Sequence, residues 1–147
     1  MQGRSPKLLD ILLVEDNIGD VELIREVFTE CGLTAEMRVA EDGKEALAVM
    51  RSDNPPEIVL LDLNLGILSG LDVLREIGES RPEFLRKVPV IVLTSSRMKR
   101  DVNLALDLGA NCYHVKPTGL DEYIRLVRVI YHHWFEFAVL PRYKPSA

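Results

Sequence analysis

The sequence predicts a doubly wound α/β fold, in which helices cover both faces of a parallel β-sheet. Short apolar runs alternate five times with segments of helical periodicity along the 147 residues, a usual length for one domain. The first, third and fourth runs are almost wholly apolar, as expected for strands buried on both faces. No internal repeat or low-complexity linker divides the chain. We therefore expect one domain over residues 1–147, with its core over about 7–135 and an aromatic tail over 136–147.

Each strand is expected where apolar residues are contiguous, and each helix where they recur three or four residues apart. The expected strands are Leu8–Val14, Ala35–Val39, Ile58–Leu61, Val88–Leu93 and Asn111–Val115. Helix limits follow from small and capping residues, because aspartate caps a first turn, glycine ends a helix and proline breaks it. The expected helices run from Val21 to Cys31-Gly32, from the cap Asp42 to Asn54-Pro55-Pro56, from Leu71 to Arg81-Pro82, from Lys99 to Leu108-Gly109, and from Gly119 past Trp134.

Composition and charge exclude several classes of protein. The formal net charge is −5 and no block of consecutive basic residues occurs, so we expect no nucleic-acid partner. No apolar run reaches the length of a membrane span, and acids rather than a signal-peptide cleavage site follow the first run. The two cysteines, Cys31 and Cys112, lack metal-ligand spacing, and such sparse use fits a reducing compartment. A cytoplasmic domain without a membrane partner is expected.

Polar side chains follow the expected strands at the point where each strand ends. These residues are Glu15 and Asp16 after the first strand, Asp62 after the third, Thr94 after the fourth and Lys116 after the fifth. The carboxyl ends of parallel strands share one edge of the sheet, and doubly wound sheets bind ligands there, where the strand order reverses. Each residue alone has an ordinary explanation as a solvated strand end, a helix cap or a surface lysine. Their joint placement favours a common site.

The chemistry of this set points to a metal ion and a phosphoryl group. Three crowded carboxylates repel one another unless a cation neutralises them, and Mg²⁺ suits the oxygens of Glu15, Asp16 and Asp62. An aspartate can also act as a nucleophile and accept a phosphoryl group as an acyl phosphate. The ammonium of Lys116 and the hydroxyl of Thr94 suit the oxygens of such a group. The five side chains together predict Mg²⁺-dependent phosphoryl chemistry on Asp62.

The chain resembles the receiver domains of two-component response regulators over about Lys7 to Arg128. The resemblance rests on DILLVEDN, LLDLNLGILSG, VIVLTSS and the pair Lys116-Pro117, in this order and at this spacing. It implies a flavodoxin-like sheet with strand order 2-1-3-4-5 and five helices. It also implies that Mg²⁺ is held by Glu15, Asp16, Asp62 and the backbone carbonyl of Asn64.

The same resemblance implies a role for each catalytic residue. Asp62 accepts the phosphoryl group from a sensor histidine kinase, and Thr94 and Lys116 complete the catalytic set. Thr94 is also the switch hydroxyl, and Tyr113 is the aromatic side chain that moves with it. The bond between Lys116 and Pro117 is expected to be cis, a form almost confined to bonds before proline.

One position departs from the family pattern. Gly66 stands four residues after Asp62, where proline is usual. Glycine permits the same turn but leaves the unfolded loop freer. The departure therefore concerns loop geometry and the kinetics of phosphorylation.

Two longer segments are similar to a subgroup of stand-alone receivers that includes the cyanobacterial phytochrome response regulator. They are DILLVEDNIGDVELIREVF and CYHVKPTGLDEYIRLVRVIYHHWFEFAVLP. This similarity implies a phytochrome as the partner kinase. We expect no output domain after the last helix, so the chain is expected to signal through a phosphorylation-driven change in partner binding and not as an enzyme.

The last helix carries more apolar surface than one buried face needs. Leu120, Ile124 and Val127 belong to one stripe at helical spacing, and Val129 and Ile130 widen it. We expect a homodimer through this helix and the tail, with an interface formed by Tyr131, Trp134 and Phe137. The alternative is that the tail Phe135–Pro141 folds back over the extra surface.

Three other functions stay open. A degenerate receiver would bind partners without turning over phosphate, although the complete acidic, hydroxyl and lysine set argues against it. A flavodoxin-like redox protein would need a phosphate-binding loop after the first strand, where EDNIGD presents carboxylates instead. An aspartyl-phosphate phosphatase would need a second catalytic aspartate two residues after Asp62, where Asn64 stands.

Overall fold

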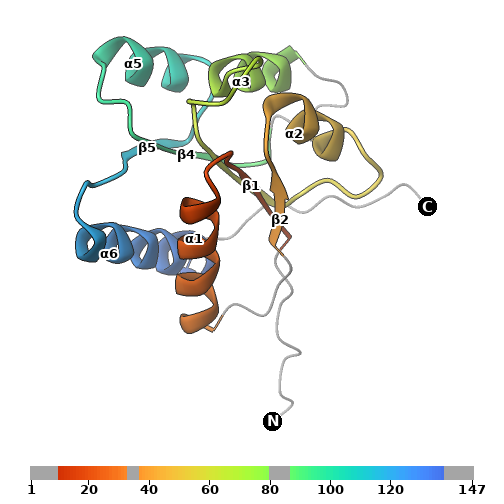
Figure 1. The fold of residues 1–147 in the computed structure, drawn as a ribbon. Coiled ribbons are helices and arrows are strands. Elements are labelled where there is room, and N and C mark those ends of the chain that lie inside the picture. Colours follow the sequence, from red (N-terminus) through yellow and green to blue (C-terminus); the bar gives the residue numbers. More distant parts are fainter. Residues whose placement is uncertain (1–9, 33–36, 80–86, 138–147) are drawn as a thin grey trace.

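The computed structural model describes residues 10–32, 37–79 and 87–137, along which strands and helices alternate (Figure 1). The strands are β1 (Ile11–Val14), β2 (Met37–Ala40), β3 (Ile58–Leu61), β4 (Val90–Thr94) and β5 (Cys112–Val115). The α-helices of these residues are α1 (Ile18–Glu30), α2 (Gly43–Met50), α3 (Gly70–Glu79), α5 (Lys99–Asp107) and α6 (Leu120–Tyr131). A π-helix, η1 (His132–Phe137), continues α6.

The five strands form one parallel sheet in the order β2-β1-β3-β4-β5, so the expected fold class and strand order are confirmed. The order reverses between β1 and β3, because the chain first adds β2 on one side of β1 and then returns to the other side. Val14 pairs with Ala40 and with Leu61, and Thr94 pairs with Val115. Leu61 pairs with Val92, so β4 and β5 extend two residues further than β3. Because all five strands are parallel, the residues that follow them still emerge at one edge of the sheet.

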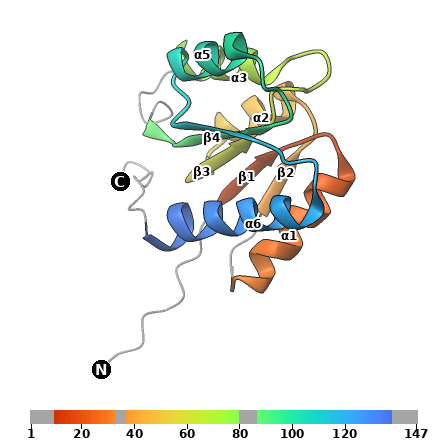
Figure 2. The same cartoon turned by 90° about the vertical axis from the view of Figure 1, so that its left-hand side faces the viewer.

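Helices cover both faces of the sheet. Figures 1 and 2 show α1 and α6 on one face and α2, α3 and α5 on the other. Successive strand residues point to opposite faces, so each central strand contributes to two hydrophobic clusters. In β1, Leu12 and Val14 pack toward α2 and α3, whereas Ile11 and Leu13 pack toward α1 and α6. Burial on both faces explains why the central strands are uninterrupted apolar runs.

Two strands on one side of the sheet begin later than the sequence suggests. β4 begins at Val90 rather than Val88, because Pro89 has no N–H to give to a ladder; its carbonyl accepts a hydrogen bond from Val59 at 2.9 Å. β5 begins at Cys112, and Asn111 bonds to Val90 through its backbone N–H and its side chain. The limits expected at residues 8–9, 35–36 and 81–82 lie outside the described residues.

Capping side chains begin the helices next to the site edge. Asp42 caps α2 as predicted, because its Oδ1 accepts the Glu45 N–H at 2.8 Å. At the start of α3, Ser69 and Asp72 bond reciprocally, with the Asp72 N–H donating to Ser69 Oγ and the Ser69 N–H to Asp72 Oδ2. Ser69, and not Asp62, therefore serves as the cap, which leaves the Asp62 carboxylate for other contacts.

The glycines predicted to end two helices do so in the left-handed conformation. Gly32 follows α1 with φ 95°, and Gly109 follows α5 with φ 108°. No helix in the described residues combines the length and the apolar character that crossing a membrane requires.

The last helix changes its hydrogen-bonding pattern after Tyr131 but continues past Trp134, as predicted. Through this change Phe135 comes to lie against Phe28 of α1, with ring centroids 5.1 Å apart. Tyr131 packs edge-on against the same ring at 5.3 Å. Three aromatic rings thus join α1 to the C-terminal helix.

Candidate functional site

Glu15, Asp16 and Asp62 meet at the edge of the sheet where β1 and β3 end. One carboxylate oxygen of each residue lies within 4.8 Å of those of the other two. The pairing of Val14 with Leu61 brings the following residues, Glu15 and Asp62, side by side. Both side chains are buried, whereas Asp16 is exposed. Three oxygen donors so placed fit a hard divalent cation such as Mg²⁺, with further positions left for water.

Lys116 brings a positive charge to this acidic group from the end of β5. Its Nζ donates to Glu15 Oε1 at 2.5 Å, to Asp20 Oδ2 at 2.9 Å and to Asp62 Oδ2 at 3.0 Å. Its backbone N–H donates to the Thr94 carbonyl at 2.8 Å, which extends the pairing of β4 and β5 beyond the strand ends and fixes where the side chain starts. Hydrogen bonds between an ammonium and carboxylates are among the strong ones, so the four side chains form one connected group.

Burial and charge act in opposite directions on the two ends of the Glu15–Lys116 bond. Burial raises the pKa of Glu15 to about 7, although its hydrogen bond from Lys116 opposes the rise. Burial lowers the pKa of Lys116, but its bonds to Glu15 and Asp20 and the charge of Asp62 outweigh this effect and raise the pKa. The ammonium therefore stays charged, and the acidic group attracts positive charge strongly.

Asn64 connects Asp62 to the end of β4. Its N–H donates to Asp62 Oδ1 at 3.0 Å, and its side-chain Nδ2 donates to Ser95 Oγ at 3.2 Å and to Thr94 Oγ1 at 3.4 Å. The Thr94 side chain is fully buried. One oxygen of Asp62 is thus held by an ammonium and the other by a backbone N–H, and Asn64 links the carboxylate to the Thr94 hydroxyl.

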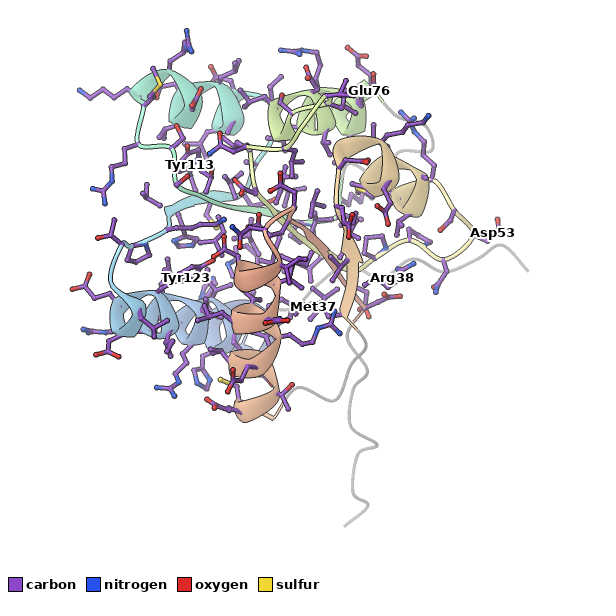
Figure 3. The ribbon with its side chains drawn as sticks, viewed as in Figure 1. Met37, Arg38, Asp53, Glu76, Tyr113 and Tyr123 are labelled. Atoms are coloured by element: carbon purple, nitrogen blue, oxygen red, sulfur yellow. The ribbon has the colours of Figure 1, made fainter. Side chains whose placement is uncertain are left out.

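Tyr113 joins β5 to the loop directly after Thr94. Its hydroxyl donates to the carbonyl of Ser96 at 2.9 Å. Figure 3 shows the ring on the α5 side of the sheet, where it packs against the α2–α3–α5 cluster. Burial raises the pKa of the phenol, so it stays a donor. Tyr113 is thus bonded to the loop that follows Thr94. Its movement together with Thr94 stays a prediction.

The acidic group is open to solvent on the side of the loop that follows β3. A pocket of about 640 Å³ lies between this loop and the start of α2, and Asp16 and Gly66 both line it. Ile67 in the same loop is fully exposed. A Cβ added at Gly66 would meet no atom within 4 Å. Glycine in place of the family's proline therefore stands beside an open approach to Asp16.

The structure brings the expected catalytic and metal-binding side chains into one group. These residues are Glu15, Asp16, Asp62, Thr94 and Lys116. Asn64 lies beside them, as expected. Two expectations stay predictions. One is the Asn64 carbonyl as a metal ligand, and the other is the cis form of the bond between Lys116 and Pro117.

The three residues expected at a dimer interface have different surroundings. Tyr131 is buried against Phe28 inside the α1–α6 core. Trp134 is half-buried and lines a cavity of about 210 Å³ between β5 and α6. The side chain of Phe137 and the tail after it lie outside the described residues. Self-association through these residues stays a prediction.

Sequence reasoning missed Asp20, the third carboxylate bonded to Lys116. Asp20 follows the α1 cap Asn17 by three residues, and Asn17 Oδ1 accepts its N–H at 3.0 Å. In the sequence it therefore looks like an ordinary first-turn acid that favours the helix dipole.

Comparison with known proteins identifies the family that carries these motifs. The sequence model of the response regulator receiver domain matches residues 11–128. The response regulator Rcp1 of Synechocystis sp. is 35% identical over 146 residues, which cover 95% of this chain and 97% of Rcp1.

Two solved structures share the fold over nearly the whole chain. The phosphorylated cyanobacterial phytochrome response regulator RcpA superposes with a TM-score of 0.86 at 34% identity, over 92% of this chain and 100% of RcpA. The Mn²⁺-bound form of Rcp1 superposes with a TM-score of 0.85 at 34% identity, over 91% of this chain and 99% of Rcp1.

Proposed function

Because this chain belongs to the response regulator receiver domain family, we propose that it accepts a phosphoryl group on Asp62 from a sensor histidine kinase. One observation carries the proposal. The buried Asp62 carboxylate is held at both oxygens, by Lys116 Nζ at Oδ2 and by the Asn64 N–H at Oδ1, each at 3.0 Å. A carboxylate held in this way presents its lone pairs in fixed directions, which reduces the entropy lost on reaching the transition state.

The proposed reaction is a displacement at phosphorus. A carboxylate oxygen of Asp62 forms the new P–O bond while the P–N bond to the kinase histidine breaks, and the imidazole leaves with the electron pair of that bond. The product is an acyl phosphate. Lys116 stabilises the transferred group, because its ammonium already lies 3.0 Å from Asp62. The protein thus completes one transfer to itself and is not an enzyme acting on a separate substrate.

The residues present fit Mg²⁺ as the cofactor. Glu15, Asp16 and Asp62 would hold it with their clustered oxygens, together with the Asn64 carbonyl. When bound, the ion neutralises charge on the phosphoryl oxygens. The acids alone would repel a phosphoryl donor, since both carry negative charge, so labelling is expected to depend on the metal.

The proposed switch begins at Thr94. In the structure its hydroxyl oxygen accepts a hydrogen bond from Asn64, which leaves the hydroxyl hydrogen available to a phosphoryl oxygen on Asp62. Tyr113 bonds to the carbonyl of Ser96, two residues after Thr94, and would follow a shift of this loop. Such a shift changes the surface of α5 and β5 and with it the choice of partner.

The proposed kinase would dock over the mouth of the site. Two exposed isoleucines flank it, Ile18 at the first turn of α1 and Ile67 in the loop after β3, with exposed fractions of 71% and 106%. Large apolar side chains this exposed favour a protein partner. Similarity to Rcp1 and RcpA supports a phytochrome as that kinase. The two cysteines form no disulfide with each other, which fits a cytoplasmic setting.

We also propose that the chain forms a homodimer through its last helix. Val129 is 55% exposed and Trp134 lines the adjoining cavity, so an apolar surface remains after α6 has packed on the sheet. Tyr131 supports this surface from inside the core. In this proposal, a second copy of the chain packs against this surface.

Intact-mass spectrometry after incubation with acetyl phosphate tests the phosphoacceptor role. Wild type with Mg²⁺ is expected to gain one phosphoryl group, and wild type with EDTA is expected to gain none. Asp62→Asn is expected to gain none in either condition while keeping its fold, because the amide is not a nucleophile of this kind. Equal labelling of Asp62→Asn would contradict the assignment.

The degenerate receiver would be favoured instead if wild type gained no phosphoryl group from acetyl phosphate and none from an autophosphorylated histidine kinase. That protein would bind its partners in the same way with and without phosphate donors.

A further inference from the structure

A carboxylate from outside the acidic motif contacts the catalytic ammonium. Asp20 Oδ2 lies 2.9 Å from Lys116 Nζ, as close as the 3.0 Å of Asp62. Glu15 takes the third position. A lysine ammonium has three N–H donors, so Glu15, Asp20 and Asp62 together occupy all of them. Because the three donors are fixed relative to one another, the two bonds to Glu15 and Asp20 set the direction of the N–H that faces Asp62.

Asp20 is itself held firmly. It lies in the first turn of α1, a helix of 13 residues, and its N–H is bonded to the Asn17 side chain at 3.0 Å. A carboxylate is favourable at this end of a helix because of the dipole. Its side chain is 24% exposed and that of Lys116 is 10% exposed, so the pair is largely withdrawn from water. Solvent and salt therefore screen this contact less than an exposed surface ion pair.

The charges of Asp20 and Lys116 also act on Tyr123 of α6. Figure 3 shows Tyr123 between α6 and the sheet, and the residue is buried. Burial raises the pKa of this phenol, the charge of Lys116 opposes the rise and the charge of Asp20 adds to it. The contact between Asp20 and Lys116 therefore joins the first turn of α1 to the end of β5, and the charges of both groups act on this phenol of α6.

We propose that Asp20 is a positioning residue for phosphotransfer, which fixes the Lys116 ammonium against Asp62. The inference deepens the proposed function and rests on it. During transfer, the N–H that faces Asp62 donates to an oxygen of the phosphoryl group arriving there, while the bonds to Glu15 and Asp20 keep the ammonium in place. No covalent bond to Asp20 forms or breaks, and no proton leaves Lys116.

The first test compares rate constants for labelling by acetyl phosphate at saturating Mg²⁺. Asp20→Ala is expected to lower the rate constant by about tenfold, or about 1.4 kcal/mol in activation free energy. Asp20→Asn keeps an oxygen acceptor of the same length and is expected to lose less than about threefold. Glu22→Ala is the matched control, because it removes one negative charge from an exposed position of the same helix; it is expected to stay within about twofold of wild type.

A second test follows Lys116 directly and needs no phosphoryl transfer. The exchange of its ammonium hydrogens with water is measured by ¹⁵N NMR in the same variants. Asp20→Ala is expected to speed this exchange relative to wild type and Glu22→Ala, because one of the three hydrogen bonds is lost.

The two tests separate failure of the inference from failure of the proposed function. Unchanged exchange in Asp20→Ala overturns the positioning role, whatever happens to the rate. A labelling rate of Asp20→Ala equal to that of wild type, or reduced equally in Glu22→Ala, also overturns it. A wild-type protein that takes no phosphoryl group contradicts the proposed function, and the exchange measurement then still decides whether Asp20 holds Lys116.

Discussion

Gly66 and Gly70 lie in the segment that leads from Asp62 to α3, and their surroundings differ. A Cβ at Gly66 would meet no atom within 4 Å, and Gly66 is not among the described residues with positive φ, which are Gly32 and Gly109. A Cβ at Gly70 would lie 2.4 Å from the Asp62 carbonyl oxygen and 2.7 Å from the Leu63 Cα. Glycine is thus replaceable at the first position and required at the second.

At this residue scale, Gly66→Ala is expected to raise the free energy of unfolding by about 0.4–1 kcal/mol, because alanine restricts the unfolded loop without a clash in the folded one. Urea denaturation measures the change.

Gly70→Ala is the matched comparison. It is expected to lower the free energy of unfolding by about 1–3 kcal/mol, since the backbone at Asp62 and Leu63 must shift to admit the methyl group. Two variants of equal stability would contradict this description of the loop.

Single residues of the site could be predicted where they directly follow a strand that is recognisable in the sequence. Glu15 and Asp62 each follow a buried apolar strand directly, and Lys116 follows the half-buried β5; the strand order then brings the three together. Asp20 has no such marker, because it lies inside a helix and reaches Lys116 only through the packing of α1 beside β5's end. Contacts between elements of this kind depend on tertiary geometry, so they could not be predicted from residue types alone.

At the scale of elements, the C-terminal helix shows where periodicity stops being informative. The segment HHWFEF continues the apolar pattern of α6, so the sequence predicts an uninterrupted helix. The change to a π-helix places Phe135 on Phe28, a contact between distant parts of the chain. Tyr131 likewise belongs to the monomer core, although its spacing is the same as that of an interface residue.

The neighbours Trp134 and Phe135 allow the proposed dimer surface to be separated from the core. Trp134→Ala is expected to raise the dimer dissociation constant by about tenfold or more, since buried tryptophans carry much of the energy of interfaces. Phe135→Ala removes the ring that packs on Phe28 and is expected to lower the free energy of unfolding by about 1–3 kcal/mol. Sedimentation and urea denaturation measure the two effects. Unchanged dimerisation of Trp134→Ala would sink the interface proposal.

The architecture of the whole molecule was the most predictable level. Uninterrupted apolar strands require cover on both faces, and the structure supplies it with α1 and α6 on one face and three helices on the other. The order of the strands could not be predicted in this way, because apolar runs show which strands are buried but not which are neighbours. That order followed from the family resemblance, and the sheet confirms it.

A metal at the acidic group should stabilise the whole fold, because β1 and β3 are the central strands that carry its ligands. At a Mg²⁺ concentration of about 100 times its dissociation constant, the free energy of unfolding is expected to rise by about 2.7 kcal/mol. Thermal or urea unfolding with Mg²⁺ and with EDTA measures this increment.

Asp16→Asn is the control for metal stabilisation. Asp16 is exposed, so without metal the variant is expected to stay within about 0.5 kcal/mol of wild type. With Mg²⁺ it is expected to gain much less than wild type, and an equal gain would place the ion elsewhere.

The distance along the chain between Glu15 and Lys116 has a consequence for the protein as it is being made. The two residues are bonded to each other yet stand 101 positions apart. On the ribosome, Glu15 and Asp62 emerge well before Lys116, and β5 is the last strand to join its edge of the sheet. A nascent chain therefore displays its acids without the ammonium that neutralises them. In the proposed function, acceptance of a phosphoryl group needs Lys116, so a nascent chain is expected to gain this capacity only after Lys116 has emerged and β5 has joined the sheet.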